Sequence, residues 1–235
     1  MVNLHISKSD EQIFRWGGMA GLAGSMLFLV VIAVVIFFVG EDPETLVGLI
    51  ERFDSIRIFR VIENGGYMLS LILWIPFFAA LYRALHTNNP AFALFGCIIS
   101  IVGLTVMITG ALPHIAMTPL HDLYYAETTT SADQASLALM WKATWGMFDA
   151  ILYAGFGLTA VGITLFGIAM MNSPAFGKSS TYLTLGIGIL SVVAAIVILV
   201  TPDSPTVFLN VFGLITISTR LGWNMLWLSG SQQEI

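Results

Sequence analysis

The stretch "GLAGSMLFLVVIAVVIFFVG", from Gly21 to Gly40, contains no charged side chain. A helix rises 1.5 Å per residue, so a helix of this length measures about 30 Å, the thickness of the hydrocarbon core of a bilayer. Because lipid offers no hydrogen-bond partner, a chain that crosses it must satisfy its backbone groups within its own helix. We therefore expect this stretch to be part of a transmembrane helix.

The rest of the chain has the same character. Of its 235 residues, 57% are hydrophobic and only 10% are charged, whereas soluble domains average about 25% charged residues. This composition predicts an all-α polytopic membrane protein, a six-transmembrane-helix bundle that forms a single domain over residues 1–235. The expected spans are about 14–39, 58–85, 91–112, 140–171, 181–201 and 206–228.

An even number of spans places both termini on one side of the membrane. With the termini inside, five basic residues lie on the inner side and four on the outer: Lys8, Arg15, Arg83, Lys178 and Arg220 against Arg52, Arg57, Arg60 and Lys142. This balance favours cytoplasmic termini by the positive-inside rule. We expect a multi-pass protein of the cell (inner) membrane.

The two longer outer connections are predicted to have structure. "EDPETLVGLIERFDSIRIF", residues 41–59, offers Asp42 as a helix N-cap and Pro43 at the first helical position. Its apolar residues then recur on one face, as in an outer amphipathic helix that lies in the membrane interface.

The second connection starts at Pro113 and is expected to be broken there and at Pro119. Ser131 and Gln134 have the spacing of a capping box. A helix from there to Met171 would be about 60 Å long, twice the bilayer core. Such a helix would project outward, tilt, or break near Trp141–Lys142. The sequence therefore predicts a small structured cap on the outer side.

Polar residues inside the expected spans are the candidates for a site. Arg60, Glu63 and Tyr67 share one helix face at spacings of three and seven, and Asn64 lies beside them. Intramembrane acids usually face a bundle interior or a cavity. Depth along the spans allows one outer-leaflet cluster that binds a ligand or an ion, made of Arg60, Glu63, Asn64, Tyr67, His114, Asp149 and Asn210. The alternative is that each acid pairs separately with a basic residue, so that the cluster is structural.

Arg220 lies toward the inner end of the last span, with Thr216 and Asn224 four residues away on either side. It either extends its charge to the inner interface or binds a lipid phosphate or a carboxylate of another subunit.

Other kinds of site have little support. His114, His121 and Asp122 are weak candidates for a metal, because no HxxxH or HExxH spacing occurs. We predict no cofactor and no catalytic residue, since no known nucleophile or phosphate-loop motif is present. Without a Lys/Arg cluster, nucleic acid is not expected as a partner.

Two ladders of small residues predict close helix packing in lipid. Gly17, Gly21 and Ser25 form one, and Gly146, Ala150 and Ala154 form the other. Their partner helices belong either to this chain or to another.

Four segments in the second half of the chain carry a resemblance. They are "MMNSPAFGK" (170–178), "TLGIGIL" (184–190), "TPDSP" (201–205) and "GWNMLWLSG" (222–230). With the six-span layout, these segments resemble a bacterial membrane family described as domain of unknown function 4386. The resemblance implies a bacterial integral membrane protein, and it implies no site residues.

Three functions fit these observations. The favoured one is a structural or accessory subunit of a larger membrane complex, with the lipid bilayer and other membrane subunits as partners. The second is a small transporter or ligand-binding membrane protein that uses the outer-leaflet cluster. The third is an intramembrane enzyme that acts on lipid. Enzyme activity stays open, and the sequence favours its absence.

Overall fold

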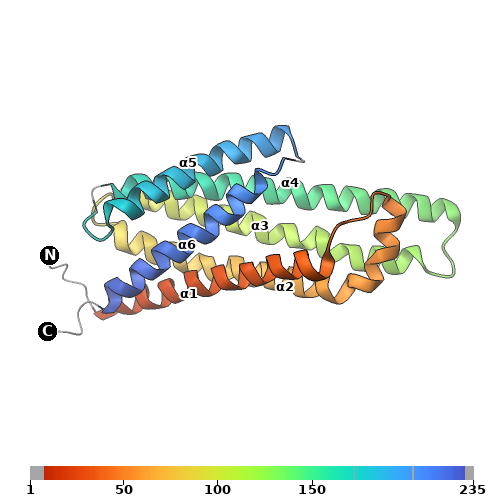
Figure 1. Ribbon diagram of the computed structural model, residues 1–235, viewed down its shortest axis with the longest axis horizontal. Coiled ribbons are helices and arrows are strands. Elements are labelled where there is room, and N and C mark those ends of the chain that lie inside the picture. The colour runs from red at the N-terminus through yellow and green to blue at the C-terminus, as the bar shows by residue number, and fades with distance from the viewer. Residues whose placement is uncertain (1–7, 172, 203, 231–235) are drawn as a thin grey trace.

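The computed structural model describes residues 8–171, 173–202 and 204–230, and this part of the chain is helical, with no strand. Figure 1 shows the helices gathered into one elongated bundle. Their bounds are α1 (Lys8–Val34), the short π-helix η1 (Val35–Val39) that continues it, α2 (Leu46–Leu85), α3 (Pro90–Tyr124), α4 (Ser131–Met170), α5 (Lys178–Val200) and α6 (Val207–Gly230).

Five of the helices are long and apolar enough to cross a membrane: α1 with η1, α2, α3, α4 and α5. The helix expected as a sixth span, α6, has 24 residues, about 36 Å at 1.5 Å per residue. It carries Asn210, Arg220 and Asn224, and none of its stretches is as apolar as the spanning stretches of the other five helices.

The helices pack mainly as neighbours in sequence, except that α6 returns to pack on α1. As a result, the start of α1 and the end of α6 lie together at one end of the bundle (Figure 1). The main core contains large buried aromatic side chains, among them Trp74, Phe77, Phe78 and Phe166.

A second, smaller core lies at the opposite end and forms the cap. It joins Ile50 and Phe53 of α2, Met117 and Leu120 of α3, and Trp141 of α4. At 35 and 40 residues, α3 and α4 are about 52 and 60 Å long, which explains how they extend beyond the other helices to build this end. The first part of α2 runs across them before the helix bends into the bundle direction (Figure 1).

The amphipathic helix predicted as a separate element is this first part of α2, which continues to Leu85 without interruption. Its N-cap is Thr45, whose hydroxyl accepts a hydrogen bond from the backbone N–H of Gly48 at 3.1 Å. The prediction of Asp42 as the cap was therefore wrong, because the Asp42 carboxylate is engaged by Arg52 and Arg60 instead.

The break predicted at Pro113 and Pro119 was also wrong, since α3 continues through both to Tyr124. A proline inside a helix costs about 3 kcal/mol. Packing against α4 offsets this cost, and the proline-containing turns bury His114 and Met117.

The long fourth helix was predicted correctly, and its cap was misplaced by one residue. In the structure, Thr130 and Asp133 make the reciprocal bonds of the capping box. Gln134 instead donates to the carbonyl of Tyr124 at 3.1 Å, and this bond ties the start of α4 to the end of α3.

The two ladders of small residues have different neighbours. On α1, a Cβ on Gly17 would lie 3.3 Å from the carbonyl oxygen of Pro76, and one on Gly21 would lie 3.1 Å from the carbonyl oxygen of Ser218, so this ladder allows α1 to approach both α2 and α6 closely. On α4, a Cβ on Gly146 would meet nothing within 4 Å, and Ala150 and Ala154 are exposed. The α4 ladder is therefore an open face of the molecule.

Candidate functional site

Arg60 is the centre of the polar cluster predicted from the sequence. Its side chain is buried, and one helical turn brings its Nη1 to 3.0 Å from Oε2 of Glu63. Its Nη2 lies 3.4 Å from Oδ1 of Asp42. Its guanidinium carbon is 5.2 Å from the ring centroid of Trp145 on α4, a cation–π distance. One side chain thus joins α2, α4 and the segment before α2.

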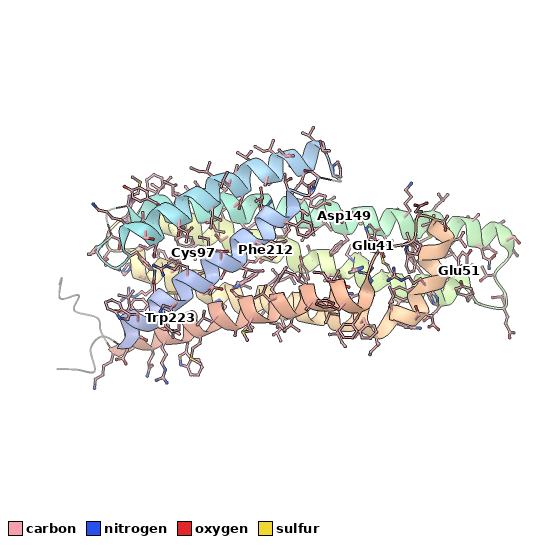
Figure 2. The ribbon with its side chains drawn as sticks, in the orientation of Figure 1. Glu41, Glu51, Cys97, Asp149, Phe212 and Trp223 are labelled. Carbon is pink, nitrogen blue, oxygen red and sulfur yellow. The ribbon has the colours of Figure 1, made fainter. Side chains whose placement is uncertain are left out.

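Asp42 reaches Arg60 because the chain reverses after η1. Gly40 has φ of 66° and donates to the carbonyl of Val35 at 2.8 Å, a backbone conformation that favours glycine. The following segment is held over α2 by Arg52, whose Nη1 donates to the carbonyl of Glu41 and lies 3.7 Å from Asp42. Figure 2 shows Glu41 in this segment and Glu51 farther toward the cap end of the bundle.

Asn64 and His114 form the second polar pair of the cluster. Oδ1 of Asn64 lies 2.8 Å from Nδ1 of His114. An amide oxygen only accepts, so Nδ1 carries the proton in this arrangement. The imidazole lies 4.8 Å from the ring of Phe148 and 5.4 Å from the ring of Trp145. Nε2 of His114 is buried and has no hydrogen-bond partner among the described residues.

Tyr67 extends the same face of α2 toward the main core. Its hydroxyl donates to the carbonyl of Met107 on α3 at 3.1 Å, and its ring lies 5.9 Å from that of Phe28 and 6.4 Å from that of Phe148. Tyr67 therefore links α2 to α3 within a packed aromatic environment.

Asn210 does not join this cluster. It lies on α6 beside a cavity of about 10 Å³ that is also lined by Phe156, Thr159 and Ser191. Phe156 is eight residues beyond Phe148, or about 12 Å along α4. Asn210 is only 3% exposed, and neither its amide nitrogen nor its amide oxygen has a partner among the described residues.

Asp149 is half-buried on α4, directly after Phe148 in the sequence. Figure 2 shows it on the middle of this helix. It follows Trp145 by four residues, so the two side chains lie on the same side of α4.

The weak metal candidates have other contacts. His121 packs on the rings of Phe53 and Tyr125 at 5.4 and 4.9 Å. Both carboxylate oxygens of Asp122 accept from Arg57, each at 3.0 Å. His114 is seven residues, about 10 Å, from His121 along α3. No group of three or more His, Cys, Asp and Glu side chains suited to a metal occurs within residues 8–171, 173–202 and 204–230.

Arg220 lies apart from all of these residues, at the end of the bundle that contains Lys8. Its Nε donates to the hydroxyl of Ser180 on α5 at 3.1 Å. Asn224 donates to the same hydroxyl at 2.8 Å. Ser180 is buried, and sequence analysis did not identify it.

The sequence also missed two partners of Arg60. Asp42 precedes it by 18 residues in a connection, where no helical periodicity relates the two. Trp145 falls within the span expected over 140–171, but nothing in the spacing indicated which helix face would meet Arg60. The centre of the site thus consists of two groups of polar contacts. Arg60 binds Asp42 and Glu63, and Asn64 binds His114, while Trp145 and Phe148 cover these residues.

No family model, curated protein or solved structure matches this chain.

Proposed function

We propose that this protein is a six-span membrane protein that serves as a structural or accessory subunit of a larger membrane complex. The contacts of the Arg60 side chain are the main support for this proposal. Its guanidinium contacts Glu63, Asp42 and Trp145 at the same time, and these three residues belong to three separate segments of the chain. A network of this kind holds helices in one arrangement.

The placement in the membrane belongs to the same proposal. α6 is long enough to act as the sixth span, since about 20 residues suffice and it has 24. The protein would lie in the inner membrane of a bacterium with cytoplasmic termini and with the cap outside. Exposed tryptophans near the terminal end, Trp16, Trp223 and Trp227, support a membrane–water interface there.

The open ladder on α4 supports a role in assembly. Small residues let the backbones of two membrane helices approach closely, and Gly146, Ala150 and Ala154 leave such a face uncovered. A transmembrane helix of another subunit fits this face.

Native purification in mild detergent tests the proposal. We expect the 25.5 kDa chain to migrate in a larger complex whose other members mass spectrometry identifies. Gly146→Leu should release those members, because the larger side chain separates the helices. Gly186→Leu is the matched control, since a Cβ there also meets nothing within 4 Å and the residue is exposed on α5. A monomer in native membranes, or equal effects of both variants, would contradict the proposal.

A ligand-binding or transport function is the second candidate, and the unpaired Nε2 of His114 favours it. A buried ring nitrogen without a partner is costly, and an ion or a polar ligand would satisfy it. Glu63→Gln separates the two functions. The structural function predicts lower stability, whereas transport predicts altered Na⁺ or proton uptake by reconstituted liposomes at unchanged stability.

A further inference from the structure

An apolar groove lies between α5 and α6, on the surface of the bundle. It has a volume of about 300 Å³ and is lined by Ile187 and Leu190 of α5 and by Phe208, Leu209 and Phe212 of α6. Leu190, Phe208 and Phe212 are 59%, 57% and 48% exposed. Figure 2 shows Phe212 on the middle part of α6. The groove is therefore accessible from the outside of the helix bundle along an apolar rim.

The floor of the groove depends on a glycine. A Cβ on Gly213 would lie 2.9 Å from Cγ2 of Ile187 and 3.1 Å from Oγ of Ser191. The first distance is shorter than real Cβ contacts and the second is tight, so a side chain here would force Ile187 and Ser191 to shift, and glycine allows the close approach of α5 and α6 at this level. The groove of about 300 Å³ beside this contact suits a slender apolar chain.

Arg220 stands at the end of the groove that faces the terminal end of the bundle. Phe212, Thr216 and Arg220 follow one another at intervals of four residues and share one face of α6, and Thr216 is the last α6 residue that lines the groove. The Nε of Arg220 reaches across to Ser180 of α5. This bond directs the guanidinium toward the start of α5, one helical turn beyond Thr216 at that end of the groove.

The remaining donors of Arg220 are available. Neither Nη1 nor Nη2 makes a hydrogen bond or an ion pair within the part of the chain that the structure describes. Neither α5 nor α6 contains an acidic residue that would neutralise the charge. The fork of a guanidinium matches the oxygens of a phosphate group.

The start of α5 adds positive potential near this place. Lys178 is its first residue and is exposed. The N-cap residue, Gly177, provides no side-chain hydrogen bond, so the first N–H groups of the helix face the surroundings with the positive end of the helix dipole.

We propose that the α5–α6 groove binds one phospholipid of the surrounding membrane, with an acyl chain in the groove and the phosphate on the Nη groups of Arg220. A charged head next to a slender apolar channel is the chemistry of a phospholipid. The proposal does not depend on the accessory function, because it concerns a different face of the molecule.

Binding of defined lipids to the delipidated full chain in detergent tests the proposal. Phosphatidylglycerol should bind and raise the melting temperature. Diacylglycerol with the same acyl chains lacks the phosphate, and glycerol 3-phosphate lacks the acyl chains, so both should bind at least about tenfold more weakly. Native mass spectrometry counts the bound lipid.

Three variants and a control test whether the lipid binds in this groove. Arg220→Gln should weaken phosphatidylglycerol binding about tenfold, since hydrogen bonds to charged groups are lost, and Arg220→Lys should restore part of it. Thr216→Trp fills an exposed position in the groove and should weaken binding while Arg220 is intact. Arg15→Gln, an exposed cation near the start of α1, should bind like the wild type.

Several results would overturn the proposal. Unchanged phosphatidylglycerol binding by both Arg220→Gln and Thr216→Trp would place the lipid elsewhere. Equal binding of glycerol 3-phosphate would indicate a site for free phosphate only. A co-purified protein that Thr216→Trp releases would show that the groove belongs to another helix.

Discussion

Removal of the Arg60 side chain tests the role of the buried network most directly. In Arg60→Met, an apolar side chain of similar length replaces the guanidinium. Glu63 then stays in a site where its side chain is only 14% exposed, without the cation 3.0 Å away that balances it. Removing one partner of a buried pair costs about 3–5 kcal/mol. Asp42, at 40% exposure, can be solvated by water, so most of the cost comes from Glu63.

The double variant separates pairing from packing. Arg60→Met combined with Glu63→Leu removes both charges and leaves two apolar side chains. Apolar replacement of a buried pair is often neutral or stabilising, so we expect the double variant to be more stable than Arg60→Met alone by about 2 kcal/mol or more.

Arg57 provides a matched control on the same helix. It binds both oxygens of Asp122, but the two side chains are 38% and 53% exposed. Exposed ion pairs contribute about 0.2–1 kcal/mol, so Arg57→Met should cost no more than about 1 kcal/mol. Equilibrium unfolding in mixed micelles, followed by tryptophan fluorescence and circular dichroism, provides the free energies. Equal costs for Arg57→Met and Arg60→Met, or additive costs in the double variant, would refute the reasoning.

Three further substitutions test separate parts of the structure. Gly18→Ala should lower the melting temperature because its Cβ would meet the backbone of α6, whereas Gly146→Ala, in open space, should be neutral or stabilise by up to about 1 kcal/mol through helix propensity. Asn210→Leu should not destabilise the protein, because the amide it removes has no partner among the described residues; a clear loss of stability in denaturant titrations would reveal a ligand or water on Asn210. Thr130→Ala should cost about 0.5–2 kcal/mol by removing the cap of α4, and hydrogen exchange should rise first in that turn, or the capping assignment is wrong.

The helical class was predictable because lipid leaves few options, and the length of the fourth helix was predictable from the capping signal near Ser131. A run without charges and of bilayer length has one stable conformation, and α1 to α5 follow that rule. Pro113 and Pro119 misled the prediction for a different reason. Propensity describes an isolated helix, whereas α3 is supported along its length by α4.

The local pairs of the site were also predictable, and the distant ones were not. Arg60 and Glu63 are three residues apart, so helix geometry alone brings them together. Asn64 and His114 were expected in one cluster from their depth, and they form a hydrogen bond. Asn210 was expected at the same depth, but the direction in which α6 crosses the bundle places it against Phe156 instead. The depth expected for Asn210 was therefore wrong, since Phe156 lies about 12 Å along α4 from Phe148.

The order of partners along the chain bears on how this protein enters the membrane during its synthesis. Chains emerge from the ribosome with the N-terminal part first, so α2 meets the bilayer before α3 and α4 exist. An unbalanced arginine in a membrane helix costs about 2.5–3.5 kcal/mol on insertion scales. Arg60 already has Asp42 before it and Glu63 one turn after it. Both counter-charges of Arg60 are therefore synthesised before Trp145, one in the segment before α2 and one on α2 itself.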